Sequence, residues 1–600
     1  MKNLKITPRS IIKKGNLRRV DISAYNEKST HYSLSVYNGE ECVAKAPFAL
    51  SSGDSTATLW LRLPDEDFEA RFVISDLSGN TVSDTVFECK KARKWTIYVT
   101  ASSHTDIGLH NSQYIQRFNS SKFIDKAIRL CDETKDREPD SQYHYMMEGS
   151  WFLSNYIADR SKEETDRLIN EYIKNGRLGV CAGVAGNHTQ TFGFEEMCRA
   201  AYSRKWLKKY GIDSKTMTMI DNNGMSWSMV TPFARAGYEN IIFAPNQWNP
   251  LPSAVWKRDS SVYAYTWNTE AGGGGSRIDV RYESALPMLF YWQGAYGEKM
   301  LVWASTAYFN GGHNFGIEIE GLPINETEEK MAKQLTLMDE RYPYDVWLVE
   351  AYTDDQEPDL ALCDRIGEWN STYEYPKLKM LGNADEPFNL VRERFDSQIP
   401  VLSGDITGGW YQHPLSAAEL LADKQEADRR LANAEKLATV AAYLNDEYKY
   451  PKSLFNKAWA SLIMNDEHSY GTSGYQGRRV YETWLQHRDW IENARDIADS
   501  ETRSALKAIA DKVKGSGKRV LAFNPAAFER TENLTADGEC SASLPPFGYK
   551  VISAEEFNAI PHIKTDISKA PTIENNYYRV KFADNGSIAE IYDKKLGKPL

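Results

Sequence analysis

The sequence predicts a multidomain protein with an N-terminal β-sandwich, an α/β barrel of mostly parallel strands, a helical bundle and the start of a C-terminal β-sandwich. The 600 residues are several times the usual length of one domain. Along the chain, the hydrophobic pattern changes from alternation, to short apolar runs, to helical periodicity. The composition, with 42% hydrophobic and 26% charged residues, is typical of a globular protein.

Residues 1–92 alternate short β-type runs such as "TATLWLRL" with turn clusters such as "SSGDS", a pattern that predicts a small antiparallel sandwich. Between residues 93 and 410, short apolar runs alternate with helical stretches. The runs lie at 95–100, 143–147, 177–183, 216–220, 240–245, 300–305, 345–352, 378–382 and 400–404. Strands that alternate with helices predict a parallel sheet, open or closed, and we expect a barrel.

Residues 411–515 are predicted to form a helical bundle. "SAAE" at 416–419 is a capping box, and apolar residues then recur at helical spacing. The predicted first helix carries Leu420, Ala427, Leu431, Ala434, Ala438 and Ala441, the second Leu454, Ala458 and Leu462 with Phe455 and Trp459 beside them, and the third Val480, Trp484, Ile491, Ala494 and Ile497. "ALKAIADKV" continues the third helix or forms a fourth. Residues 518–600 return to β periodicity with too few strands for a sandwich, so we expect a longer parent protein.

Composition excludes several classes of function. The net charge of -11 and the lack of a long Lys/Arg run argue against a nucleic-acid partner. The N-terminus lacks the apolar segment of a secretory signal and no stretch is long enough to span a membrane, so we expect a cytoplasmic protein if Met1 is the native start. The seven scattered cysteines form no CxxC, so a metal would be held by His and carboxylates. The oligomeric state is left open.

Polar side chains follow several of the predicted strands. His104 and Asp106 follow the run at 95–100, Asp221 the run at 216–220, Asp354 and Asp355 the run at 345–352, and Asp405 the run at 400–404. His468 follows the second predicted bundle helix. Each has an ordinary explanation, such as a hydrogen-bonded turn, a solvated loop or a cation at a helix C-terminus. Because ligands bind at the carboxyl ends of parallel strands, we expect the group to form one site.

Together these residues predict the chemistry of glycoside hydrolysis. His104, Asp106, Asp221 and His468 supply nitrogen and oxygen ligands suited to zinc or a similar divalent ion. A cation would keep Asp221 ionised, while a separate protonated acid would donate a proton to a leaving oxygen. Candidate substrate-binding residues near strand ends are Trp151, Trp227, Trp303, Asp405 and Trp410. Core packing is the alternative interpretation for these tryptophans.

Several motifs occur in order along the chain: "SHTDIG", "EGSWFL", "MIDNNGMSWSMVTPFARAGYENIIFAPN", "MNDEHSYG" and "VLAFNPAAFERTE". With these motifs the chain, from about residue 95 to its end, resembles glycoside hydrolase family 38, the class II α-mannosidases. Leu109, "DNNG" and "SGDITGGWYQH" differ from the better-known members and indicate a divergent branch.

The resemblance implies a zinc-dependent retaining mechanism. His104, Asp106, Asp221 and His468 would be the zinc ligands, and Asp221 would also be the nucleophile that forms a glycosyl-enzyme. Asp355 is the predicted general acid/base, with Asp354 as its alternative. Zinc would hold two hydroxyls of a mannose-like ring in an oligosaccharide, and no organic cofactor is implied.

Two other functions remain open at this point. In a metal-dependent carbohydrate deacetylase, the metal would activate water directly and Asp221 would not need to be a nucleophile. A glycan-binding protein would have kept the fold and lost turnover.

Overall fold

The computed structural model describes residues 1–222, 224–244, 287–305, 308, 315–317, 321–406, 417–469, 478–535, 539–556 and 571–600. The chain divides into two compact units. The first unit comprises residues 1–431 and 454–497, and the second comprises residues 432–453 and 498–600. Trp410 and the first residue of the "SAAE" capping box lie outside the described residues.

The N-terminal segment forms two four-stranded antiparallel sheets around one hydrophobic core. Side chains alternate across the sheet, as in β6, where Phe68, Ala70, Phe72 and Ile74 are buried. One sheet contains β1 (Lys2–Lys13), β2 (Leu17–Asn26), β5 (Gly53–Leu61) and β16 (Tyr373–Tyr375), and the other contains β3 (Thr30–Asn38), β4 (Glu41–Leu50), β6 (Phe68–Asp76) and β7 (Thr81–Cys89). The alternation over residues 1–92 therefore forms a sandwich, to which β16 adds a strand from a later part of the chain.

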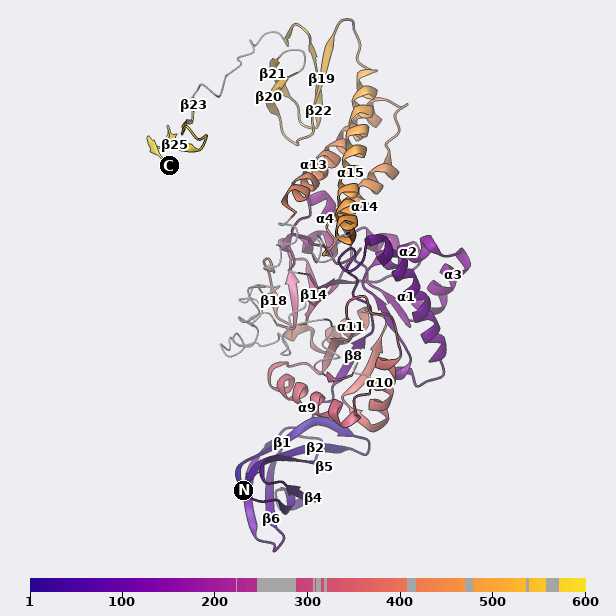
Figure 1. Cartoon of the computed structure of the whole chain (residues 1–600), viewed down its shortest axis with the longest axis vertical. Helices are drawn as coiled ribbons and strands as arrows, with labels where there is room; N and C mark the ends of the chain where they lie inside the picture. Colours follow the sequence, from indigo (N-terminus) through magenta and orange to yellow (C-terminus); the bar gives the residue numbers. More distant parts are fainter. Residues whose placement is uncertain are drawn as a thin grey trace. The chain divides into compact units, whose positions relative to one another are not determined.

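Every apolar run predicted as a strand in the central region contains one. These strands are β8 (Thr96–Thr100), β9 (Tyr145–Met147), β10 (Leu178–Val180), β11 (Thr216–Ile220), β12 (Asn240–Ala244), β14 (Lys299–Ala304), β15 (Val346–Glu350), β17 (Lys377–Leu381) and β18 (Val401–Leu402). Figure 1 labels β8, β14 and β18 among them. The sequence did not predict β13 (Leu289–Gln293), which pairs antiparallel with β14. The described strands form sheets in the orders β15-β8-β17, β11-β12-β14-β13-β18 and β10-β9, and closure into one barrel stays a prediction.

Helices separate most of these strands, and local sequence signals support the ends of two of these helices. The helix α3 begins with a capping box between Ser161 and Glu164. The helix α11 has acidic residues in its first turn and basic residues in its last turn, which complements the helix dipole. The described α-helices of the region are α1 (Gln113–Glu133), α2 (Ser150–Asp159), α3 (Lys162–Arg167), α4 (Phe194–Ala200), α5 (Ser203–Lys208), α6 (Val230–Arg235), α9 (Ile324–Arg341), α10 (Ala361–Thr372) and α11 (Asp385–Phe395).

Three long helices follow: α13 (Ala418–Leu444), α14 (Lys452–Asn465) and α15 (Arg478–Ala510). They agree with the predicted periodicity, and most of "ALKAIADKV" continues α15. Among the periodic apolar positions of α14, Leu454 is 42% exposed. The buried stripe of α14 instead runs through Phe455, Ala458, Trp459 and Leu462.

The described strands of the second unit form small antiparallel sheets: β19 (Arg519–Asn524) with β22 (Gly548–Ser553), β20 (Arg530–Thr535) with β21 (Glu539–Leu544), and a set of β23 (Thr572–Glu574), β24 (Tyr578–Phe582), β25 (Ile588–Asp593) and β26 (Lys598–Pro599).

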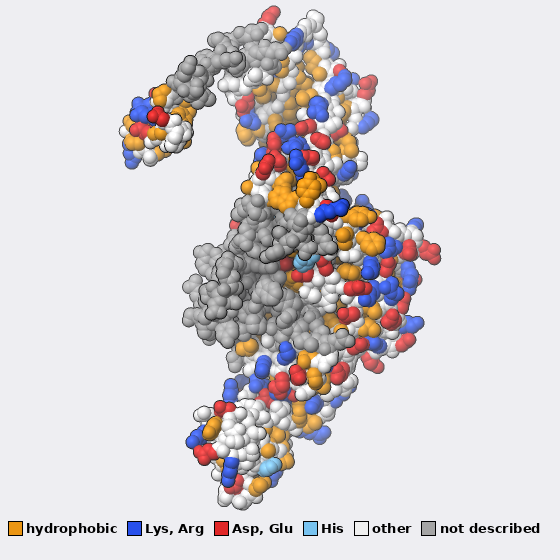
Figure 2. Space-filling view, in the orientation of Figure 1, with side chains coloured by type: hydrophobic (Ala, Val, Ile, Leu, Met, Phe, Trp, Pro, Cys, Tyr) orange, Lys and Arg blue, Asp and Glu red, His pale blue; other side chains and the backbone are white. Residues whose placement is uncertain are grey.

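The surface charges and the cysteines can be compared with what the composition indicates. On the face shown in Figure 2, Lys and Arg side chains are interspersed with Asp and Glu side chains. All seven cysteines are free thiols. Among the described helices, none combines the length and the apolar character needed to cross a membrane.

Candidate metal centre

Parallel pairing of β8 with β15 brings the first two groups of candidate residues together. The two strands are in register up to Thr100 and Glu350. Beyond the strand ends, the His104 N–H donates to Thr353 O at 3.3 Å, and the Asp355 N–H donates to His104 O at 2.7 Å. His104 therefore lies beside the Asp354–Asp355 pair, as the strand-end argument predicts.

Asp221 follows β11 in an unusual backbone conformation. Its N–H donates to Ala244 O at 2.8 Å, which extends the pairing of β11 with β12 by one residue. Its φ is 53°, and Asp355 has a φ of 50°. This left-handed region is uncommon for residues other than glycine, and such strain is concentrated at functional sites. Both aspartates predicted to carry the chemistry are held in it.

His468 reaches the site from the segment after α14. The His468 N–H donates to Gly186 O, and the His188 N–H donates to Asp466 O, both at 2.7 Å. Gly186 makes this approach possible, because a Cβ there would lie 3.3 Å from His468 Nδ1 and 3.0 Å from Asn222 Oδ1. The last predicted ligand thus comes from outside the α/β region, 364 residues after His104 in the chain.

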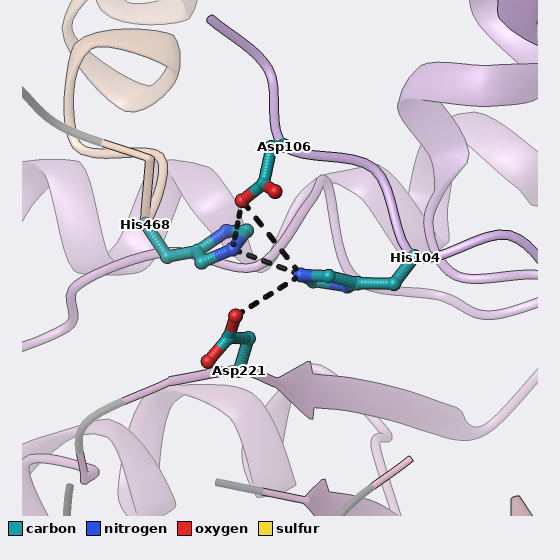
Figure 3. Close-up of side chains that lie close together, drawn as sticks. All are labelled: His104, Asp106, Asp221 and His468. Atoms are coloured by element: carbon teal, nitrogen blue, oxygen red, sulfur yellow. Dashed lines mark hydrogen bonds and ion pairs between the residues drawn. The ribbon is translucent and has the colours of Figure 1, made fainter. Parts of the chain in front are cut away.

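The four predicted ligands converge on one point (Figure 3). His104 Nε2 lies 3.0 Å from His468 Nε2, 3.7 Å from Asp221 Oδ2 and 4.0 Å from Asp106 Oδ1. His468 Nε2 lies 3.1 Å from Asp106 Oδ1. One ligand atom from each residue lies within 4.8 Å of all the others. All four residues are at most 5% exposed, so the cluster is enclosed by protein.

Two glutamates that were not predicted as site residues orient the histidines. His104 Nδ1 lies 3.1 Å from Glu148 Oε2, and His468 Nδ1 contacts the Glu467 carboxylate. Histidines that bind metals are usually held in this way through their other ring nitrogen. Glu148 lies inside the motif "EGSWFL" and Glu467 inside "MNDEHSYG". Their place in these motifs was the signal by which the sequence could have indicated a role at the site.

Electrostatics favour positive charge at the centre of the cluster. Burial lowers the pKa of His468, but the carboxylates of Glu467 and Asp106 raise it by more, to about 10. Burial raises the pKa of Asp106, but the hydrogen bond from His468 and the charge of His104 lower it by more, so that it lies well below its usual value. These carboxylates require a compensating cation, which histidine protons or a metal ion can supply in competition.

The residues present fit a divalent metal ion. Two imidazole nitrogens and two carboxylate oxygens are a common ligand set for zinc. The cluster is buried, its ring nitrogens face one another, and each histidine is oriented by a second carboxylate.

Asp354 and Asp355 have different surroundings. The Tyr308 ring packs at a tilt against the His104 ring, with the ring centroids 4.6 Å apart. The Tyr308 hydroxyl donates to Asp354 Oδ1 and lies 3.5 Å from Asp221 Oδ2. The Asp355 carboxylate accepts from Gln116 Nε2, which lies 2.7 Å from each of its oxygens, and the Asp355 side chain is 18% exposed.

A third histidine lies at the edge of the cluster. His110 Nδ1 lies 3.4 Å from Asp106 Oδ2 and 3.6 Å from Asp355 Oδ2. Tyr308, Gln116 and His110 were not among the predicted site residues.

The described candidate substrate-binding residues lie in different surroundings. Trp303 is fully buried with its ring edge against Phe388, an environment that favours the core-packing interpretation over substrate contact. Trp227 donates from Nε1 to Gln293 O and from its backbone N–H to Asp405 Oδ1, both at 2.7 Å, so Asp405 fixes the Trp227 loop. Trp151 is partly buried against the core.

Comparisons with known proteins agree with this geometry. Residues 94–405 match the family model described as "Glycosyl hydrolases family 38 N-terminal domain". The fold is similar to that of an alpha-mannosidase from Enterococcus faecalis V583, with a TM-score of 0.61 and 16% identity over 84% of this chain and 61% of that chain. It is also similar to a protein in glycosyl hydrolase family 38 from Enterococcus faecalis, with a TM-score of 0.56 and 14% identity over 84% of this chain and 59% of that chain. The comparison with curated proteins found no match.

The chain spans about 60% of the length of these two structures, 61% of the first and 59% of the second. At this identity the likeness establishes the fold, while the family model covers just over half of the chain and includes three of the four converging residues. The sequence motifs, the convergence of the predicted ligands and the family match all lead to one conclusion: the chain belongs to glycosyl hydrolase family 38.

Proposed function

We propose that this protein is a zinc-dependent retaining glycoside hydrolase that cleaves α-mannosides from oligosaccharides. The observation that carries the proposal is the buried convergence of His104, Asp106, Asp221 and His468 beside a second pair of acids. The family supports glycoside hydrolysis, and the similar Enterococcus faecalis structure described as an alpha-mannosidase supports mannose as the sugar.

The cation would supply Lewis acidity and a binding point for sugar hydroxyls. The chain's own residues perform the bond changes. Asp221 attacks the anomeric carbon, and the bond from that carbon to the leaving oxygen breaks as the new ester bond forms. Asp221 has a suitable position because its strained backbone directs the carboxylate towards the centre of the cluster (Figure 3).

Asp355 acts as the general acid/base in this proposal. It gives its proton to the leaving oxygen, and in the second half it takes a proton from the water that hydrolyses the ester and releases Asp221. Its partial exposure allows exchange of that proton with solvent, and Gln116 fixes the orientation of its carboxylate. Asp354 instead accepts the hydrogen bond from the Tyr308 hydroxyl. Its role in the proposal is to hold that hydroxyl beside Asp221.

Activity on aryl glycosides tests the proposal directly. The purified protein should hydrolyse an aryl α-mannoside faster than the corresponding α-glucoside or β-mannoside, lose activity after dialysis against a chelator, and regain it with zinc. Release of acetate from an N-acetylated sugar without glycoside cleavage would indicate the deacetylase. Binding of mannosides without turnover would indicate the glycan-binding protein.

A covalent trap tests the nucleophile separately from the metal. A 2-deoxy-2-fluoro mannosyl fluoride should label the wild-type protein once, on the peptide that contains Asp221. Asp221→Asn should lose activity by at least about 10³-fold, since it removes the attacking oxygen. Asp339→Asn is the matched control, because this partly buried aspartate accepts hydrogen bonds from Ser10 and Trp95 and should leave activity unchanged. Labelling on another residue would contradict the assignment.

A further inference from the structure

The segment Asp466–Ser469, here called the ligand segment, carries His468. Its backbone pairs with the loop 186–188 through the two 2.7 Å hydrogen bonds described above. His188 Nε2 also lies 3.1 Å from His468 O. The Ser469 hydroxyl donates to Asp106 Oδ1 at 3.0 Å. These contacts fix one side of the segment, and a further attachment is made by side-chain charge.

That attachment is a buried lysine on α13. Lys424 is 0% exposed, and its ammonium is surrounded by three acceptors, two from residues 191–196 and one from the ligand segment. Nζ donates to Glu196 Oε2 at 2.5 Å and to Thr191 O at 2.9 Å, and it pairs with Asp466 Oδ2 at 2.6 Å. An ammonium has three donors, so this arrangement uses its full capacity.

The two carboxylates of this cluster have different positions relative to His468. Glu196 lies in the first turn of α4, where it also accepts from the Gly193 N–H. Asp466 belongs to the ligand segment itself. Both acids are at most 1% exposed, so neither has water to replace the lysine as a partner. Loss of the positive charge would leave a buried carboxylate two residues from a metal ligand, and the segment would have to move to hydrate it.

We propose that Lys424 is a positioning residue of the metal centre: through its ion pair with Asp466 it fixes the ligand segment, and thereby His468, against the other three ligands. The inference rests on the proposed function, because it concerns the same metal site. It assigns to α13 a part in metal binding, although Lys424 acts on His468 only through Asp466.

Zinc affinity, measured by competition with a chelating dye, tests the inference without any activity assay. Lys424→Met should weaken zinc binding by about 10- to 100-fold, the usual effect of removing a residue that positions a ligand. Ile366→Ala is the stability control, because Ile366 is fully buried on α10 and belongs to the hydrophobic core of the α/β region. It should destabilise the protein with little change in zinc affinity.

Two further variants keep the test decisive if Lys424→Met does not fold. Asp466→Asn removes the arm of the cluster that reaches the ligand segment and should weaken zinc binding by about 10-fold or more. Glu196→Gln removes the other arm of the same lysine and should change zinc affinity by less than about 3-fold. Equal losses in both variants, or wild-type affinity in Asp466→Asn, would overturn the inference. Absence of zinc binding by the wild-type protein would instead overturn the proposed function.

Discussion

At the scale of single residues, the orientation of His468 depends on what surrounds its ring. Nε2 faces the other ligands, and Nδ1 contacts the carboxylate of Glu467. Glu467 is itself fixed, because its Oε2 accepts from the Ser469 N–H at 3.0 Å. The charge on Glu467 therefore stabilises one tautomer and one ring orientation of His468.

Replacing Glu467 by glutamine should weaken zinc binding by about 10- to 100-fold, because the variant keeps the volume and loses the charge that orients the ring. Equilibrium competition with a chelating dye measures the effect. Glu163→Gln, an exposed position in the first turn of α3, is the matched control and should bind zinc as the wild type does. Wild-type affinity in the Glu467 variant would show that the backbone contacts alone orient His468.

Glu350 gives a second prediction for one residue. It ends β15, is fully buried, and burial raises its pKa to about 8. The folded state therefore keeps this proton when the unfolded chain has lost it. Because the unfolded carboxyl ionises near its ordinary pKa of 4.5, stability should fall as the pH rises from about 4.5 to 8.

Glu350→Gln removes this titration. The variant should gain stability relative to the wild type as the pH rises, by an amount on the order of a few kcal/mol at pH 8, and should differ least near pH 4.5. Denaturant unfolding at several pH values measures this difference, and the low-pH points serve as the internal control. A difference that is independent of pH would contradict the buried neutral carboxyl.

At the scale of elements, strand ends were the most informative part of the sequence. Polar residues directly after apolar runs predicted His104, Asp106 and Asp221 because parallel strands end at one edge. Glu148 and Glu467 could not be predicted as partners of the histidines, because that pairing depends on tertiary contacts.

The faces of buried elements were also ambiguous. Trp303 lies in β14, a strand with almost every residue buried, so no alternation distinguishes its two faces. On α14, Leu454 and Phe455 are adjacent apolar residues, and one residue rotates a helical face by about 100°, so their spacing did not decide which of them is buried. The structure buries Phe455 and leaves Leu454 42% exposed. Phe455, and not Leu454, therefore faces the core.

This difference can be measured with a matched pair on α14. Leu462→Ala should cost about 2 to 5 kcal/mol of unfolding free energy, because Leu462 is fully buried and the truncation leaves a cavity. Leu454→Ala makes the same chemical change at a position that is 42% exposed and should cost less than about 1 kcal/mol. Both values come from denaturant unfolding. Equal losses of unfolding free energy in the two variants would indicate that Leu454 also packs in the core.

At the scale of the whole molecule, the metal ligands join distant parts of the chain within one of its two units. His104 and His468 both belong to the first unit, and every other residue of the cluster does as well. A bound ion stabilises only the folded form of the unit that contains its site. Removal of the metal should consequently affect the two units differently.

Calorimetry with and without a chelator tests this expectation. A ligand present at about 1,000 times its dissociation constant stabilises the folded state by about 4 kcal/mol, so chelation should lower the melting temperature of the first unit by several degrees. The transition of the second unit, which contains the β19–β22 pair, should not move. His468→Ala is the control, because a protein without the fourth ligand should melt at the same temperature with and without chelator. A chelator effect that persists in this variant would place the stabilising ion somewhere other than the cluster in Figure 3.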